Sequence, residues 1–280
     1  MKYLSVCSGI ESATCAWHPL GWEPVGFSEI DPFPRSVLTH HYPDVPLFGD
    51  FTEIQADDIE RPQGIVGGTP CQDFSIGGGG ASWDGERGGL SWRYVELVQR
   101  IMPDWFVWEN VRNALQGKHR QGFCEFIKRL MQLGYCVAWR VLDARYFATA
   151  QQRSRVFVVG TLGNTSSGKI LFESQGVRGI DSQADPPTVS VCLTARGVGS
   201  LDDRELYVEQ SGRIRHITPL EAERIMGFPD NYTYVPHKGK PAFDTPRYRA
   251  IGNSMAVNVM SFLGQRIQAV AGNLPNGGVK

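Results

Sequence analysis

A cysteine and a glutamate follow two strand-like runs in this chain. Cys71 comes after the apolar run at residues 64–68, which is typical of a buried strand that ends in a glycine-rich break. Glu109 follows a second such run at residues 105–108. In open α/β folds, the carboxyl ends of the strands carry ligands and chemistry. If the two strands are neighbours, a thiol and a carboxylate face one crevice, and together they can carry out covalent chemistry.

Arginines occur in pairs spaced two residues apart. The pairs are Arg153 with Arg155, Arg213 with Arg215, and Arg247 with Arg249. On extended backbone, this spacing puts both side chains on one face. Each pair alone is compatible with an ordinary surface position. The net charge of −1 gives no basic footprint, so any binding of nucleic acid must rest on local features such as these.

Length and composition indicate a globular protein. The chain has 280 residues, of which 41% are apolar and 20% charged, which allows an ample core. This length predicts one large domain and one small one. No apolar stretch approaches the roughly 18 residues of a membrane span, and the first residues lead directly into a strand pattern. We therefore expect a cytoplasmic protein without membrane contact.

The cysteines do not have the spacing of metal ligands. The six residues contain no CxxC pair, so neither zinc nor another metal is expected. In a cytosolic chain most thiols are small buried hydrophobes rather than disulfide partners. Cys71 is the exception because of its position after a strand.

Residues 1–160 alternate strand-like and helix-like segments, which predicts a βαβ sheet. The expected strands cover residues 3–7, 24–28, 45–48, 65–68, 105–108, 137–142 and 155–161. Residues 122–133 have the apolar spacing of a helix, which Gly134 is expected to end. Thr218, Pro219 and Glu221 predict a helix start with a capping box. A last helix is expected at residues 248–270.

Two segments differ from this pattern. Residues 76–89 contain seven glycines and closely follow Cys71, which favours a mobile loop over substrate rather than a linker. Residues 163–212 are polar and turn-rich, with weak periodicity. They indicate a small inserted domain or a long loop.

Eight short motifs occur in the order of a known family. They are Ser8-Gly9-Ile10, Glu29-Ile30-Asp31, Gly49-Asp50, Pro70-Cys71-Gln72, Arg87-Gly88-Gly89-Leu90, Glu109-Asn110-Val111, Gln151-Gln152-Arg153-Ser154-Arg155 and Gly252-Asn253-Ser254. Each motif alone is weak evidence. Together, over nearly the whole chain, they make it resemble the bacterial and phage DNA (cytosine-5-)-methyltransferases.

The resemblance implies an α/β fold with a Rossmann-like sheet, as in methyltransferases that depend on S-adenosylmethionine. It implies a catalytic and cofactor-binding domain at residues 1–160 and 213–280. A small target recognition domain is expected between them, at residues 161–212.

The chemistry of cytosine methylation explains the residue types. Addition of a thiolate to carbon 6 makes carbon 5 able to attack an electrophilic methyl group, and cysteine is both a strong nucleophile and a competent leaving group. A carboxyl group at the ring nitrogen promotes this addition, and an arginine near the base oxygen disperses negative charge. Cys71, Glu109 and Arg155 suit these roles, and Arg153 is expected to orient the loop or an acidic partner. The alternative for Glu109 is a carboxylate that binds amides at a helix start.

The methyl donor that the resemblance implies is S-adenosylmethionine. Gly9 follows the first strand, where backbone can approach a ligand closely. Glu29 follows the second strand about 20 residues later, the spacing at which a carboxylate accepts hydrogen bonds from ribose hydroxyls. The resemblance places Asp50 at the adenine amine, and Asn253 and Ser254 at the methionine end. The other expected cofactor residues are Ser8, Ile10, Ile30 and Pro70.

Four positions depart from the family pattern. The family usually has an aromatic residue at Cys7 and glycines at Glu11 and Ser12. The first loop is therefore expected to take another backbone path and to lack an aromatic contact with adenine. Ser154 stands where the family commonly has glutamate, so the support around the neighbouring arginines is expected to differ. These departures concern cofactor affinity more than reaction type.

The partner that the resemblance implies is double-stranded DNA. Stacking buries carbons 5 and 6 of cytosine, so the target base must be flipped out, at a cost of a few kcal/mol. Gln72 is expected to fill the vacated space, and Ser75 and Arg87 to contact DNA. In the recognition segment, Thr194 and Arg196 are expected to reach base edges.

Two other functions remain open. One branch of the family uses the same motifs on transfer RNA, and assays of both nucleic acids with labelled donor would separate the two enzymes. A catalytically silent DNA-binding protein could keep the same fold, although the combination of Cys71, Glu109 and Arg155 argues against it. Cofactor binding would test that reading. We expect a monomer, in a restriction-modification, phage or orphan setting that the sequence does not separate.

Overall fold

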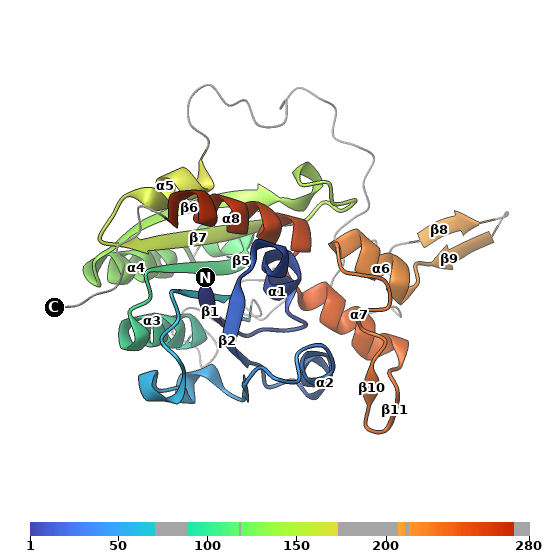
Figure 1. Cartoon of the computed structure of the whole chain (residues 1–280). Helices are drawn as coiled ribbons and strands as arrows, with labels where there is room; N and C mark the ends of the chain where they lie inside the picture. The colour runs from blue at the N-terminus through green and yellow to red at the C-terminus, as the bar shows by residue number, and fades with distance from the viewer. Residues whose placement is uncertain (71–88, 118, 173–206, 211–212, 272–280) are drawn as a thin grey trace.

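A seven-stranded mixed sheet forms the centre of the structure, a computed structural model that describes residues 1–70, 89–117, 119–172, 207–210 and 213–271 (Figure 1). Its strands are β1 (Lys2–Val6), β2 (Glu23–Ser28), β3 (Leu47–Phe48), β4 (Gly64–Gly67), β5 (Trp105–Val111), β6 (Tyr135–Asp143) and β7 (Ser154–Leu162). The spatial order is β3-β2-β1-β4-β5-β7-β6, in which β7 is antiparallel to both neighbours and the strands from β3 to β5 pair in parallel. All seven predicted strands are confirmed, with small differences at their ends.

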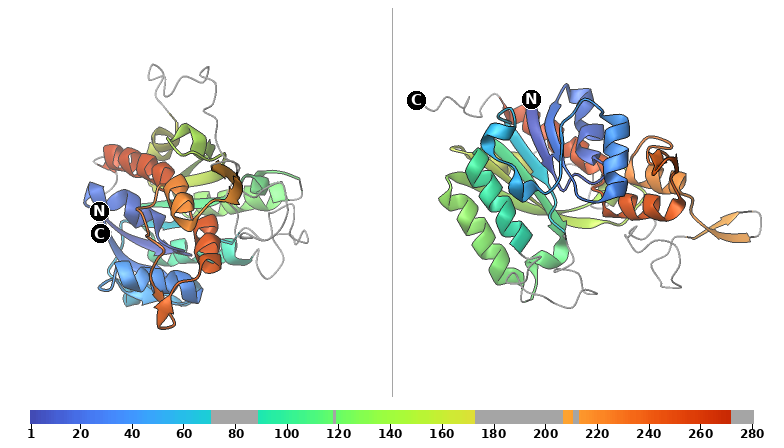
Figure 2. Two further views of the ribbon diagram at one scale, coloured as in Figure 1. Left: turned by 90° about the vertical axis from the view of Figure 1, so that its right-hand side faces the viewer. Right: turned by 90° about the horizontal axis from the view of Figure 1, so that it is seen from below.

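Helices cover both faces of the sheet (Figure 2). They are α1 (Ser12–Trp17), α2 (Pro32–His41), α3 (Gly89–Ile101), α4 (His119–Gln132), α5 (Ser166–Leu171), α6 (Pro219–Met226), α7 (Asp244–Asn253) and α8 (Val257–Val270). Alternate residues of β5 separate two cores: Trp105 packs with α1 and α8, whereas Phe106 packs with α3 and α4. In the described part of the chain, no helix is both long enough and apolar enough to span a membrane.

The helix ends follow the sequence signals, with one exception. Thr218 and Glu221 form the expected capping box of α6, and Gly134 has a φ of +94° after α4. The expected single helix at residues 248–270 is wrong, because α7 ends at Asn253 and α8 begins at Val257. Ser254 is extended, with φ −74° and ψ 162°. Its carbonyl accepts a hydrogen bond from Arg153 instead of continuing the helix.

The first residues of the expected recognition domain pack against the central sheet and α8. Leu162 is the last residue of β7, and α5 packs against α8 and β6. Ile170 and Leu171 are completely buried in the same core as α1 and α8. The domain boundary expected at residue 161 stays a prediction, and the structure places the ten residues that follow it in β7, α5 and the turn between them. The expected boundary at residue 212 falls between β8 (Tyr207–Gln210) and β9 (Arg213–His216), which pair as a hairpin.

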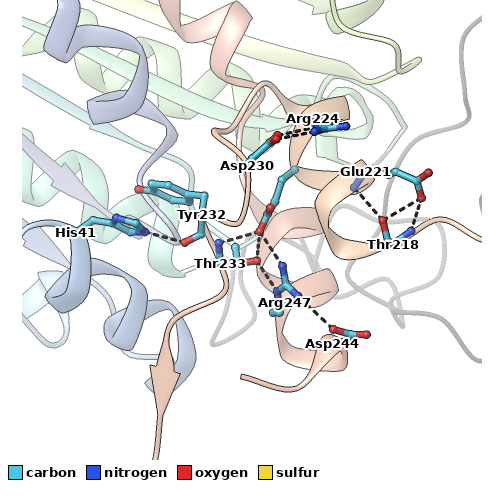
Figure 3. Close-up of polar contacts among 10 residues, drawn as sticks. His41, Thr218, Glu221, Arg224, Asp230, Tyr232, Thr233, Asp244 and Arg247 are labelled. Carbon is cyan, nitrogen blue, oxygen red and sulfur yellow. Dashed lines mark hydrogen bonds and ion pairs between the residues drawn. The ribbon is translucent and has the colours of Figure 1, made fainter. Parts of the chain in front are cut away.

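A buried ion pair joins α6 to α7 (Figure 3). Oε1 of Glu223 accepts hydrogen bonds from the backbone and hydroxyl of Thr233 and from Nη2 of Arg247, the last at 3.2 Å. The neighbouring Tyr232 stacks on His41 of α2, with ring centroids 4.1 Å apart. These contacts fix α7, whose last residues reach the site described next.

Candidate active site

A cavity of about 330 Å³ lies at the carboxyl ends of the parallel strands. Its wall includes Cys7 and Gly9 after β1, Glu29, Ile30 and Asp31 after β2, Gly49 and Asp50 after β3, Gly68, Thr69 and Pro70 after β4, Glu109 and Val111 of β5, Arg153 and Arg155 at β7, and Gly252 and Asn253 of α7. The chain order reverses between β1 and β4, a topological switch point of the kind where open α/β sheets bind ligands.

Glu109 and Arg155 form an ion pair at one end of the cavity. Nε of Arg155 lies 3.3 Å from Oε1 of Glu109, and both side chains are largely buried. Burial raises the pKa of the Glu109 carboxyl, and the nearby charges of Arg155 and Arg153 offset this rise only in part. Glu109 therefore keeps its proton to a higher pH than an exposed glutamate. Glu109 lies within β5, where it pairs with Phe157 of β7. It is therefore not placed to bind backbone amides at a helix start, which was the alternative role.

Arg153, which was expected to orient the loop or an acidic partner, donates hydrogen bonds to main-chain carbonyls at the end of α7. Its Nη2 donates to the carbonyl oxygens of Gly252, at 3.2 Å, and Ser254, at 2.7 Å. The side chain thus connects β7 to the turn between α7 and α8. Support for this segment comes from Asp143, which accepts from the backbone N–H of Arg153 and from the hydroxyl of Ser154. Asp143 could not be identified from the sequence, because no motif or spacing connects it with Arg153, ten residues later in the chain.

Glu29 joins the loops after β1 and β2. Its Oε2 accepts from the backbone N–H of Gly9 at 2.8 Å, and its Oε1 accepts from Ile30 and Asp31, each at 2.8 Å. Gly9 has a φ of +56°, in the left-handed region that favours glycine. Gly9 and Glu29, 20 residues apart in the chain, are therefore in contact at the carboxyl ends of β1 and β2. Asp50 lies on the same cavity wall and accepts from the backbone N–H of Thr52.

Three of the expected cofactor residues do not line the cavity. The Ser8 hydroxyl links β1 to β2, since it donates to the Ser5 carbonyl and accepts from the backbone N–H of Ser28. Ile10 is completely buried in the core, and Ser254 donates its hydroxyl to the Ile251 carbonyl. Ser8, Ile10 and Ser254 thus contact the residues around the cavity but are not part of its wall. The expected residues that do line it are Gly9, Glu29, Ile30, Asp50, Pro70 and Asn253.

The loop after β1 has glutamate in a backbone conformation that glycine adopts most readily. Glu11 has a φ of +64°, and its buried carboxylate accepts from the backbone and hydroxyl of Thr14 and from the hydroxyl of Ser5. It thereby caps α1. Burial raises the pKa of Glu11 to about 7. Residue 11 thus adopts the left-handed region although it is not glycine, and the expected change of backbone path stays a prediction.

The remaining predicted site residues fall outside the described part of the chain. They are Cys71, Gln72, Ser75, Arg87, Thr194 and Arg196. Within the described ranges, no group of three or more His, Cys, Asp or Glu side chains could hold a metal ion. The described part of the site is thus a cavity with a paired acid and arginine at one end and a glutamate-bridged loop at the other.

Some known proteins resemble this chain in sequence, and some solved structures resemble it in fold. A relative from Escherichia phage P1, named as a DNA N-6-adenine-methyltransferase, is 28% identical, and the match covers 95% of this chain but only 61% of that protein. Type II methyltransferase M2.BsuMI of Bacillus subtilis (strain 168) is 27% identical, over 98% of this chain and 77% of that protein.

Two solved structures have the same fold. That of a Spodoptera frugiperda DNMT2 mutant superposes with a TM-score of 0.73 at 19% identity, over 95% of this chain and 99% of that one. S. pombe Dnmt2 gives a TM-score of 0.73 at 16% identity, over 96% and 99%. The model of the family described as C-5 cytosine-specific DNA methylase matches residues 1–175 and 166–269. With nearly the whole chain matched, the protein belongs to the C-5 cytosine-specific DNA methylase family.

Proposed function

We propose that this protein transfers a methyl group from S-adenosylmethionine to carbon 5 of a cytosine flipped out of double-stranded DNA. The observation that carries the proposal is the Glu109–Arg155 pair, 3.3 Å apart, in the same cavity as the Glu29-bridged loop. A cytosine ring offers both a nitrogen and an exocyclic oxygen on one edge. A carboxyl group that retains its proton and an adjacent guanidinium match these two atoms.

The cofactor end fits a nucleoside with a charged tail. The cavity of about 330 Å³ lies within the range of roughly 300–1,000 Å³ usual for small-molecule pockets. Apolar atoms of Ile30, Pro34 and Phe51 line it beside the carboxylates of Glu29 and Asp50. In our proposal the apolar side chains hold adenine, and the carboxylates accept from its amine and from ribose hydroxyls. When bound, S-adenosylmethionine supplies an electrophilic methyl group on a sulfonium.

The residues at the other end prepare the base. We assign the nucleophile to Cys71, whose thiolate adds to carbon 6 and forms a carbon–sulfur bond, while Glu109 protonates or hydrogen-bonds the ring nitrogen. The electron pair then available at carbon 5 attacks the methyl carbon, and the methyl–sulfur bond breaks so that a neutral thioether leaves. Solvent water then accepts the carbon 5 proton, the bond between Cys71 and carbon 6 breaks to release the thiolate, and Glu109 takes back its proton from the ring nitrogen, which returns an aromatic ring and a free enzyme. Arg155 stabilises the charge on the base oxygen, and Arg153 holds the wall through residues 252 and 254.

Methylation of adenine is the second candidate, because the phage P1 relative carries that name. Transfer to an exocyclic amine requires no addition to the ring, so it would leave a nucleophilic thiol without a task. Cytosine is therefore favoured, because its methylation uses the thiol for addition and the acid–arginine pair at the ring nitrogen and oxygen. We propose that base readout resides in the segment between Phe172 and β8, which is the part of the chain left without a chemical role.

The test is product analysis with the intact chain. Purified protein is incubated with labelled donor and either genomic DNA or transfer RNA, and the modified nucleosides are identified by mass spectrometry. We expect 5-methylcytosine in DNA, no transfer by the Cys71→Ser variant, and a rate lower by about two to four orders of magnitude for Glu109→Gln. N6-methyladenine, or 5-methylcytosine in RNA alone, would contradict the proposal. Bisulfite sequencing of host DNA after expression would then report the site.

A further inference from the structure

Thr69 is the centre of a buried hydrogen-bond cluster that joins β4, α3 and β5. Its hydroxyl oxygen lies 3.0 Å from the hydroxyl oxygen of Ser91. It also accepts from Nε1 of Trp108, at 3.2 Å, and from Nδ2 of Asn110, at 3.3 Å. The same Asn110 amide donates to the carbonyl of Thr69 at 3.2 Å. All four residues are buried.

The donors of this cluster fix the direction of each bond. A hydroxyl has one hydrogen and two acceptor lone pairs. The indole of Trp108 and the amide of Asn110 can only donate here, so they occupy both lone pairs of Thr69. Its single hydrogen must then go to Ser91. The orientation of the Asn110 amide is itself set, because Oδ1 accepts from the backbone N–H of Val111 at 2.8 Å. Residue 69 thus uses the full hydrogen-bonding capacity of a hydroxyl.

The cluster lies between the two chemical groups of the proposed site. Thr69 lines the cavity and stands two residues before Cys71 in the chain. Asn110 directly follows Glu109. A shift between the ends of β4 and β5 would therefore change the position of the chain leading into Cys71 relative to the Glu109 carboxyl.

We propose that the Thr69 hydroxyl is a positioning group that fixes the chain entering Cys71 against the strand that carries Glu109. This inference rests on the proposed function, in which the thiol and the carboxyl act on one base. Reactions of this kind are sensitive to placement, and a misplacement of about 1 Å can cost a hundredfold in rate. The hydroxyl acts through geometry and touches no reacting atom.

The experiment compares Thr69→Val with Thr69→Ser. Valine keeps the shape of threonine but leaves Trp108 and Ser91 without their partner, whereas serine keeps the hydroxyl and loses only a methyl group. Ser91→Ala removes the acceptor of the Thr69 hydrogen and serves as a second variant if Thr69→Val does not fold. The readouts are kcat, the KM values for DNA and donor, and the rate of covalent trapping on DNA that contains 5-fluorocytosine. Fluorine at carbon 5 cannot leave as a proton does, so the thiol adduct persists.

We expect Thr69→Val to lower kcat and the trapping rate at least about tenfold, with both KM values within about threefold of wild type. Thr69→Ser should restore most of the loss. Trapping by Thr69→Val at the wild-type rate would overturn the inference, as would equal losses in Thr69→Val and Thr69→Ser. If Thr69→Val does not fold, an unchanged trapping rate in Ser91→Ala would overturn it. If wild-type protein forms no adduct that depends on Cys71, the proposed function fails, and this inference fails with it.

Discussion

Gly68 packs directly against the carboxyl group of Glu109. A Cβ atom at residue 68 would lie 2.9 Å from Oε2 of Glu109 and 3.2 Å from its backbone oxygen. Both contacts are shorter than ordinary van der Waals separations, and one of them involves backbone that cannot rotate away. Glycine is therefore needed at this position for space, and the place of the acid in the cavity depends on it.

Replacing Gly68 with alanine should displace the acid without unfolding the protein. The added methyl group forces the Glu109 carboxyl away from the position where it meets Arg155, so we expect single-turnover methylation to fall by about a hundredfold. Gly168→Ala is the matched control, because a Cβ at residue 168 of α5 meets no atom within 4 Å. An equal rate for both variants in quenched-flow assays would show that the Gly68 contact does not set the geometry of the acid.

Arg155 should control the pH at which Glu109 loses its proton. Burial raises the pKa of Glu109, and the Arg155 charge opposes that rise because it favours the ionised carboxylate. In Arg155→Met the pKa should rise further, so the protonated form persists to higher pH. The alkaline limb of the single-turnover rate should then move to higher pH, while the maximal rate falls. Arg129→Met, on α4, is the control for loss of a remote charge. A limb that stays in place or moves to lower pH would contradict this assignment.

Sequence patterns predicted the sheet, because strands follow local periodicity. Arg155 was assigned to the same site as Glu109 from the chemistry of cytosine methylation and the family resemblance, rather than from a strand end, since it lies near the start of the antiparallel strand β7. Sequence patterns did not predict the contacts of Thr69, whose partners Ser91, Trp108 and Asn110 lie 22 to 41 residues away in the chain. Long-range hydrogen bonds of this kind leave no periodic trace. The break between α7 and α8 was missed for the same reason, since Arg153, about 100 residues earlier, binds the carbonyls at the turn.

Glu11 should make the protein less stable as the pH rises. Its pKa is about 7 in the folded protein, above the usual value of 4.5, because burial disfavours the ionised form. The folded state therefore holds this proton more tightly than the unfolded chain, and the stability gained is complete below about pH 4.5 and is lost as the pH passes through about 7.

Glu11→Gln removes this titration while nearly preserving shape. The free energy of unfolding of wild type, relative to Glu11→Gln, should decline between about pH 4.5 and 7 in urea denaturation measured at several pH values. A difference between the two proteins that stays constant over this range would mean that Glu11 is ionised throughout, held by Thr14 and Ser5.

The buried pair of Arg247 and Glu223 should matter more than any exposed pair in this chain. Arg247→Met leaves the Glu223 carboxylate buried without its cation, and loss of one partner of a buried pair typically costs about 3–5 kcal/mol of unfolding free energy. Adding Glu223→Gln to Arg247→Met removes the stranded charge, so the double variant should regain much of this loss. The control is Arg249→Met, two residues away, whose exposed guanidinium lies 4.0 Å from Asp31 and should change stability by less than about 1 kcal/mol. Since α7 carries Asn253 into the cavity, the affinity for S-adenosylmethionine, measured by calorimetry, should fall in Arg247→Met and recover in the double variant.

The outcome that would contradict this prediction is equal stability of the two single variants. If Arg247→Met and Arg249→Met unfold at the same urea concentration, the ion pair does not hold α7 in place. The position of Asn253 must then depend on the turn that Arg153 binds.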